Sequence, residues 1–243
     1  MRHEHKIVIS QAQYFVLSAR MRALLRPDPH MPSEQGYLIS SLYFDDMQES
    51  AYYEKLSGSA DRNKYRVRIY NGDLSRIRLE CKHKVGDRIE KRSAWLETAD
   101  YHALVRGDMR VLADKEDALC REVYSLCTSR LMRPRVVVSY LREAYLHPLS
   151  NTRITFDKHL RAGWTEQAMR TILTDDMPVF PTSEFPYPDA VILEIKYDEY
   201  IPKFITDALQ TGGTLLAASK YVLCRDALHA AGKSFLFEQT TRN

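Results

Sequence analysis

Charged and apolar residues alternate in several short segments of the chain. Because successive side chains of a β-strand point to opposite faces, this alternation predicts strands, as does enrichment in β-branched and aromatic residues. We therefore expect strands over residues 3–9, 37–44, 65–70, 77–83, 88–96, 135–146, 153–160 and 190–197. Turn sequences at Asn71-Gly72-Asp73 and at Gly86-Asp87 make residues 65–96 a β meander.

Short helices are predicted between these strands and at the end of the chain. Residues 11–25 place Phe15, Met21 and Leu24 among polar residues, as an amphipathic helix does, and the prolines of 27–32 end this helix. Further helices are expected over residues 98–105, 115–131, 202–209 and 219–231, and over a segment that Asp45 or Asp46 caps and that runs to about Leu56. Residues 178–188 are proline-rich and predict a loop.

The predicted strands carry their charges on one face. The residues that share this face are Glu4 and Lys6, Arg66 and Arg68, Arg78, Glu80 and Lys82, Tyr140 and Arg142, Arg153, Thr155 and Asp157, and Glu194 and Lys196. The opposite faces are apolar, which for any single strand is typical of an ordinary half-buried sheet. The repetition of Arg beside Arg, and of Glu with Lys, indicates a binding site for an anion, because close like charges repel unless an anion lies between them.

A chain of phosphates suits such a face. Guanidinium groups bind phosphate oxygens through two parallel N–H bonds, and ammonium groups act as mobile point charges. The glutamates among these cations are explained if Mg²⁺ or Mn²⁺ is held there, because such ions bridge carboxylate and phosphate oxygens.

Composition excludes several other classes of function. The chain has 35 Lys and Arg against 32 Asp and Glu, and a net charge of only +3 is far from that of a general nucleic-acid binder. The cysteines and histidines form no zinc-ligand spacing, and P-loop, G-x-G-x-x-G and G-x-S-x-G motifs are absent. Without a signal-peptide core or a long apolar run, the chain is expected to be soluble and cytoplasmic. Trp95 and Trp164 are expected in the core or in the wall of the site.

Several segments of the sequence are similar to those of a known family. The chain resembles the catalytic domain of the vacuolar transporter chaperone (VTC) polyphosphate polymerases, within the triphosphate tunnel metalloenzyme (CYTH-like) superfamily. The likeness covers essentially the whole chain, through RHEHK at 2–6, SLYFDD at 41–46, KYRVRIYNGD at 64–73, IRLECK at 77–82, RPRVVVSYLREAY at 133–145, NTRITFD at 151–157, LEIKYDEYIP at 193–202 and SKY at 219–221. It implies an α+β fold with an eight-stranded antiparallel tunnel surrounded by helices, as a single domain over residues 1–243.

The same resemblance implies roles for individual residues. Glu4 and Lys6 match the opening ExK motif of the superfamily, Tyr140 would line the wall, and Glu194 would be the principal metal ligand, with Glu4 and Glu80 as further carboxylates. The phosphate-binding residues would be Arg66, Arg68, Lys82, Arg142, Arg153 and Lys220. Lys196 is added because it shares the face of Glu194.

Two positions depart from the family pattern or stay ambiguous. Motif position favours Lys91 as a phosphate-binding residue, whereas parity counted from Glu90 favours Arg92, and a bulge could reconcile the two. Ala217 stands where related domains place a second lysine, so one phosphate contact is missing there.

The predicted function is transfer of the γ-phosphoryl group of ATP to a polyphosphate chain, with Mn²⁺ or Mg²⁺ as cofactor. The ligands would be ATP and polyphosphate or triphosphate, with neither nucleic acid nor membrane insertion involved. One alternative is a triphosphatase on the same scaffold, in which Glu4 or Glu80 orients water. The other is a non-catalytic polyphosphate-binding module, which Ala217 favours.

Overall fold

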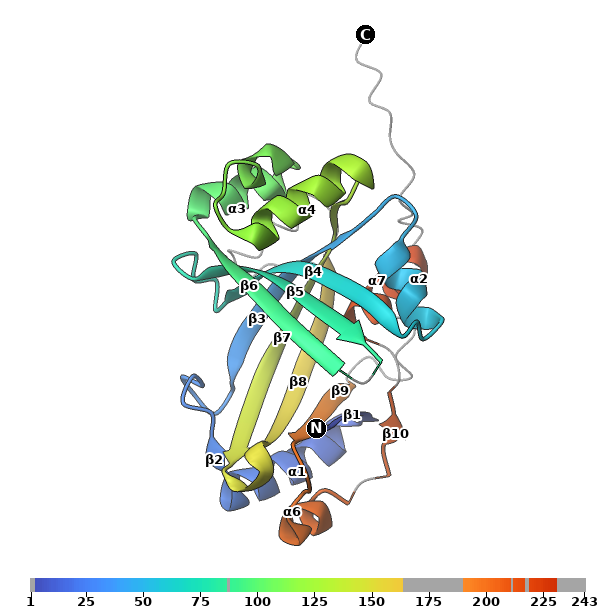
Figure 1. The fold of residues 1–243 in the computed structure, drawn as a ribbon. Helices are drawn as coiled ribbons and strands as arrows, with labels where there is room; N and C mark the ends of the chain where they lie inside the picture. The colour runs from blue at the N-terminus through green and yellow to red at the C-terminus, as the bar shows by residue number, and fades with distance from the viewer. Residues whose placement is uncertain (1–2, 87, 164–189, 211, 217–218, 231–243) are drawn as a thin grey trace.

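The computed structural model describes residues 3–86, 88–163, 190–210, 212–216 and 219–230. Their main feature is one antiparallel sheet in the order β10-β1-β9-β8-β7-β3-β4-β5-β6, with β2 pairing on β7 (Figure 1). The longer strands are β1 (His3–Ile9), β3 (Tyr37–Asp45), β4 (Asp61–Tyr70), β5 (Ile77–Val85), β6 (Arg88–Leu96), β7 (Arg133–His147), β8 (Thr152–Gly163) and β9 (Val191–Tyr197). Each corresponds to a predicted strand, and the α+β class with a large antiparallel sheet is confirmed.

Helices cover the sheet in three places (Figure 1). α3 (Thr98–Val105) and α4 (Ala118–Ser129) lie together at one end of the molecule, and α1 (Gln11–Leu24) and α6 (Lys203–Ala208) lie at the opposite end. α2 (Ser50–Leu56) and α7 (Lys220–Ala230) pack together beside β4. Each predicted helix is therefore present, and residues 178–188 lie outside the described part of the chain.

The apolar faces of the strands form the cores beneath these helices. Val67, Ile69 and Leu79 pack with residues of α3 and α4, and Phe156 and Leu193 pack with residues of α1 and α6. Their burial leaves the charged residues of the same strands on the other face of the sheet. The described residues include no helix that is long and apolar enough to cross a membrane.

The predicted apolar face of α1 is partly wrong. Phe15 is 64% exposed and Leu24 is 43% exposed, whereas Tyr14, Leu17 and Met21 are buried against the sheet. Residues spaced by three and four share one side of a helix, and the buried stripe contains a tyrosine that we had not assigned to it. The hydroxyl of Tyr14 donates to the buried carboxylate of Glu143 at 2.6 Å, which explains why a polar group lies in this core.

Several boundaries and short elements also differ from the prediction. α2 begins at Ser50, and Asp45 ends β3, with its carboxylate accepting the N–H of Ala51 at 2.9 Å. Asp46 likewise accepts the N–H of Ser50 at 2.9 Å, so both aspartates cap the helix from outside it. The short elements β2 (Arg26–Pro27), β10 (Thr214–Leu215), η1 (Met109–Leu112) and η2 (Leu149–Asn151) were not predicted, because they are too short to show periodicity.

Candidate functional site

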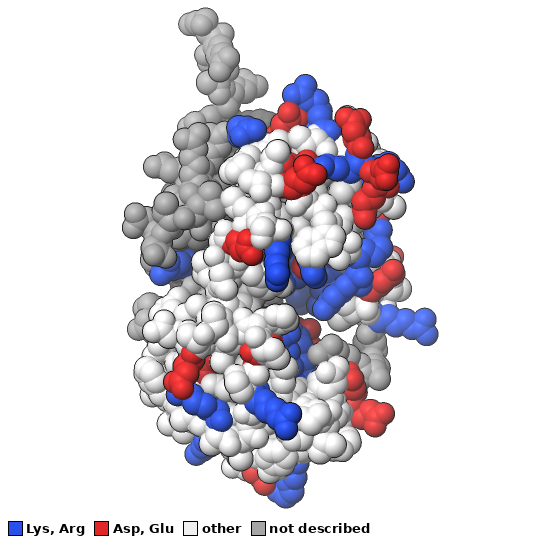
Figure 2. Space-filling model, turned by 90° about the vertical axis from the view of Figure 1, so that its left-hand side faces the viewer, with Lys and Arg blue, Asp and Glu red and all other residues white. Residues whose placement is uncertain are grey.

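The charged face of the sheet is concave. β1 and β5 are separated in the sheet by β9, β8, β7, β3 and β4, yet Lys82 Nζ on β5 lies 3.7 Å from Glu4 Oε2 on β1. The sheet therefore curls until side chains from its distant strands meet, and Figure 1 shows β4, β5 and β6 crossing over β7 and β8. On the face drawn in Figure 2, Lys and Arg side chains gather in a hollow between the upper and lower parts of the molecule.

Glu194 is the most enclosed of the predicted metal ligands on this face. It is 4% exposed, and its carboxylate accepts hydrogen bonds from Lys220 at 2.8 Å, Lys196 at 2.8 Å and Arg142 at 3.3 Å. Burial alone would raise the pKa of Glu194, but Lys220, Lys196 and Arg142 hold it well below its usual value. A fixed carboxylate charge thus lies among three cations.

Asp157 is a second buried carboxylate at this position, and sequence reasoning gave it no role. Arg142 donates to it through two hydrogen bonds, Nε to Oδ1 at 2.6 Å and Nη2 to Oδ2 at 2.7 Å. Lys220 Nζ lies 2.6 Å from Asp157 Oδ2, so Lys220 bridges Asp157 and Glu194. The alternation of side chains along the strand placed Asp157 on the charged face, but it could not show that Arg142 on β7 is its partner.

The helix α7, which begins with Lys220, is bound to the end of β3. The hydroxyl of Tyr221 donates to Asp45 Oδ2 at 2.5 Å, and the carboxylate of Asp45 caps α2. Tyr140 lies beneath the cations, with its ring centroid 4.9 Å from Lys220 Nζ and 5.3 Å from Arg142 Cζ. Its ring thus forms part of the wall around these two cations.

Arg66 and Arg68 share a carboxylate of the protein itself. Arg66 Nε donates to Glu80 Oε2 at 2.7 Å, and Arg68 Nη1 lies 3.8 Å from the same oxygen. Arg66 also donates to the hydroxyl of Tyr43 at 3.0 Å. The expectation that these like charges need an anion between them is met in part by Glu80, whose pKa burial would raise but Arg66 and Arg68 lower.

A pocket rich in lysine lies at one end of the concave face. It has a volume of about 270 Å³ and is lined by Glu4 and by Lys6, Lys55, Lys64, Lys82 and Lys84, among others. Burial, together with neighbouring cations, lowers the pKa of Lys64 to about 7 and that of Lys82 to about 8. Burial would raise the pKa of Glu4, but Lys196, Lys6 and Lys82 lower it to about 2. Lys64 was not among the predicted site residues, although it shares the parity of Arg66.

These lowered pKa values predict that polyphosphate binding takes up protons. A phosphate chain near Lys64 and Lys82 favours their charged forms and raises both pKa values, so affinity should rise as the pH falls from about 10 to about 7. Titration calorimetry of tripolyphosphate at pH 8, in buffers of different ionisation enthalpy, measures this uptake. Lys64→Arg should reduce it, because arginine stays charged at this pH. Binding of tripolyphosphate without proton uptake would contradict the assignment of both lysines.

The remaining predicted residues lie at separate positions on the face. Lys91 is in register with Lys82, whereas Arg92 points to the other side of the sheet and donates to Glu122 of α4 at 2.9 Å. The motif position, not the parity count from Glu90, thus identifies the residue on the charged face, and the pairing of β5 with β6 is regular there. Arg153 donates to Asp28 at 2.7 Å, and Ala217 lies outside the described residues.

The predicted metal ligands are only partly brought together. Glu4 and Glu194 lie around the same ammonium group, since Lys196 Nζ is 4.0 Å from Glu4 Oε1 and 2.8 Å from Glu194 Oε2. Glu80 is instead paired with Arg66. Among the described residues, no three His, Cys, Asp or Glu side chains form a group that could hold a metal ion.

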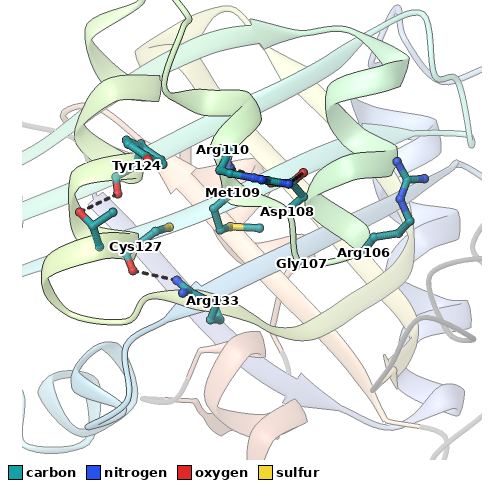
Figure 3. Close-up of a pocket in the computed structure, with 9 residues that line it drawn as sticks. Arg106, Gly107, Asp108, Met109, Arg110, Tyr124, Cys127 and Arg133 are labelled. Carbon is teal, nitrogen blue, oxygen red and sulfur yellow. Dashed lines mark hydrogen bonds and ion pairs between the residues drawn. The ribbon is translucent and has the colours of Figure 1, made fainter. Parts of the chain in front are cut away.

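A larger pocket lies near α3 and α4, away from the predicted site residues (Figure 3). It has a volume of about 430 Å³, and its lining includes Arg106, Arg110 and Arg133. Arg110 is paired with Asp108 at 2.9 Å, and Arg133 donates to the backbone carbonyl of Cys127 at 2.8 Å. Arg110 and Arg133 therefore serve the local structure, and the concave face remains the better candidate site.

The two faces of β4 predict opposite results for neighbouring substitutions. Arg66→Ala and Arg68→Ala should each weaken tripolyphosphate binding with little change in stability. Val67 is 1% exposed, so Val67→Ala should lower the free energy of unfolding by about 2 kcal/mol and leave binding unchanged. Calorimetric titration and urea denaturation of the three variants test this. Impaired binding in Val67→Ala, with normal binding in both arginine variants, would place the site on the wrong face.

The comparison with models of protein families agrees with the resemblance seen in the sequence. A family model described as the VTC domain matches residues 1–229. Two solved structures are similar over most of the chain. A "putative adenylate cyclase" from Bacillus halodurans has 10% identity, covers 98% of this chain and 93% of its own, and gives a TM-score of 0.49. Another from Vibrio parahaemolyticus has 9% identity, coverage of 96% and 87%, and a TM-score of 0.40. None of the curated proteins compared with the chain matches it.

Proposed function

The chain belongs to the VTC domain family, and we propose that it is a polyphosphate polymerase, which transfers the γ-phosphoryl group of ATP to the end of a polyphosphate chain. The observation that carries this proposal is the concave face itself. Its arginines and lysines surround Glu194, a buried carboxylate whose pKa is held well below its usual value. Such a face offers a phosphate chain several cations in a row, together with a fixed negative charge.

The concave sheet would close around the phosphate chain as an eight-stranded tunnel. The approach of Lys82 to Glu4, across the interior of the sheet, supports this closure. An enclosed site strengthens each charge interaction, because the effective dielectric constant is lower there than at an open surface. Hydration water is also removed from the reacting phosphates as they enter.

The reaction needs no covalent intermediate with the protein. An oxygen of the terminal acceptor phosphate, already ionised at neutral pH, forms a bond to the γ-phosphorus of ATP. The bond from that phosphorus to the β,γ-bridging oxygen breaks, and ADP leaves with the electron pair. Arg66, Arg68, Lys82, Arg142 and Arg153 would align the two phosphate chains and offset the charge that develops between them.

A divalent metal fits the residues near Glu194. Mg²⁺ commonly takes one or two protein carboxylates and completes its ligands with phosphate oxygens and water. Glu194 would be the principal ligand and Glu4 a second one, since both carboxylates are ionised. Glu80 fits this role less well because of its position. Glu4 and Glu194 lie around the same ammonium group of Lys196, whereas the ion pairs of Glu80 are with Arg66 and Arg68. When bound, Mn²⁺ or Mg²⁺ would neutralise phosphate charge and help to orient the chain.

The ion pairs of Glu4 and Glu80 favour a polymerase over a triphosphatase. A hydrolase needs a carboxylate that is free to orient water. Glu4 Oε1 lies 2.6 Å from Lys6 Nζ, and Glu80 Oε2 accepts from Arg66 at 2.7 Å, so each carboxylate already has a cationic partner. An acceptor phosphate, unlike water, needs no such base.

Incubation of the purified protein with ATP and Mn²⁺ tests the proposal. We expect long polyphosphate on a denaturing gel, with ADP formed in equal amount to the phosphate incorporated. Release of free phosphate without polymer would identify a triphosphatase. Binding of polyphosphate without any turnover of ATP would identify a binding module, and either result would overturn the polymerase assignment.

A further inference from the structure

Trp95 lies on the charged face of the sheet and is open to solvent. Sequence reasoning placed it in the core or in the wall of the site, but it is 61% exposed. Its neighbours Ala94 and Leu96 are buried in the core that includes residues of α3 and α4, so the side chain of Trp95 points the other way. An exposed indole on a face rich in Arg, Lys and Glu is not explained by packing in a core.

The surroundings of Trp95 combine guanidinium groups and aromatic rings. Arg78 is the cross-strand partner of Trp95, and its Cζ lies 4.3 Å from the centroid of the indole ring. On the next strand, Arg68 pairs with Arg78, and its Cζ lies 5.9 Å from the ring of Tyr70. Tyr70 is itself 36% exposed. Two arginines and two exposed rings thus lie side by side on three neighbouring strands.

Arg78 and Trp95 lie beside Arg68, which is assigned to phosphate binding, on the next two strands of the sheet. Glu80, which joins Arg66 and Arg68, follows Arg78 by two residues along β5, and two residues of a strand span roughly 7 Å. That is also about the length of a ribose with its first phosphate. A nucleoside triphosphate whose phosphates lie on Arg66 and Arg68 would therefore bring its base to Trp95.

We propose that Trp95, supported by Arg78, is the platform on which the nucleobase of the donor nucleoside triphosphate stacks. This inference rests on the proposed function, because it takes the phosphates to lie on the concave face. A base presents a π-face to the indole, and the stacked guanidinium keeps the ring in position. Inorganic tripolyphosphate, which has no base, gains nothing from this contact, so Trp95 would distinguish the nucleotide donor from the polyphosphate chain.

The test compares two ligands on the same variants by titration calorimetry of the full chain. The ligands are inorganic tripolyphosphate and an ATP analogue with a β,γ-imido bridge, which is not turned over. Stacking of one base predicts that Trp95→Ala weakens binding of the analogue about 10-fold, with tripolyphosphate affinity unchanged. Trp95→Phe should keep most of the analogue affinity. Phe15→Ala removes a similarly exposed ring from α1, and should change neither affinity.

The outcomes separate this inference from the proposed function. If Trp95→Ala weakens the binding of both ligands equally, or of neither, Trp95 is not a platform for the base. The proposed function still stands in that case, provided that the unaltered protein binds tripolyphosphate. If the unaltered protein binds neither ligand, both ideas fail. Selective loss of the analogue in Trp95→Ala, with recovery in Trp95→Phe, supports the proposal.

Discussion

Glu194→Gln is expected to lower Mn²⁺-dependent phosphoryl transfer by about 100-fold to 1,000-fold. The substitution removes one negative charge and keeps nearly the same shape. In the protein that charge is held by Lys220, Lys196 and Arg142, and it is the one best placed to bind a divalent ion beside the phosphates. The rate of polymer formation from ATP, measured over a range of Mn²⁺ concentrations, tests this expectation.

Glu122→Gln provides the matched control. Glu122 is also a carboxylate in an ion pair, but its partner is Arg92, on the other side of the sheet. Its substitution should leave the rate unchanged. Circular dichroism should show that both variants keep the native fold. Full activity of Glu194→Gln at every Mn²⁺ concentration would remove this residue from the site.

Tripolyphosphate is expected to raise the thermal midpoint of the protein by several degrees. A ligand that binds only the folded state, present at a hundred times its dissociation constant, stabilises that state by about 2.7 kcal/mol. For a domain of this size, such a change corresponds to a shift of roughly 5 to 10 °C. Differential scanning fluorimetry with and without tripolyphosphate measures the shift directly.

Arg142→Ala should reduce this stabilisation sharply. Arg142, Lys196 and Lys220 are three cations against the two carboxylates of Asp157 and Glu194. Loss of Arg142 therefore removes the net positive charge that attracts phosphate to this cluster. Arg92→Ala removes an arginine from the opposite side of the sheet and should leave the shift intact. A repeat near physiological salt adds a further check, because exposed charges are screened over about 8 Å. A shift that vanished there would argue against an enclosed site.

The strands and their charged face could be predicted because both depend on local periodicity. Alternation in residues 64–73 and 77–82 was enough to place Arg66, Arg68 and Lys82 on one side, and the structure has them there. The amphipathic face of α1 was assigned less well, because Phe15 and Leu24 are apolar but exposed. Isolated exposed apolar side chains are common on protein surfaces, so the sequence pattern does not show that Phe15 is exposed.

The partners of the charged residues could not be predicted, because they come from distant strands. Parity shows the side on which Asp157 lies, but its bonds to Arg142 and Lys220 depend on strand register and on the docking of α7. The approach of Lys82 to Glu4 depends on how far the whole sheet curls. Parity counted from Glu90 favoured Arg92, but the pairing of β5 with β6 places Lys91 on the charged face.

The carboxylates placed among the cations have a consequence for selection by ligand length. Glu80, Asp157 and Glu194 already occupy Arg66, Arg142 and Lys220, so an incoming phosphate must exchange one ion pair for another. A single orthophosphate gains little from one such exchange. A phosphate chain that is bound at one cation meets the next cation at a high effective concentration, so its affinity rises with each further contact along its length. The protein would therefore discriminate by avidity, and millimolar cellular phosphate would compete poorly with a polymer.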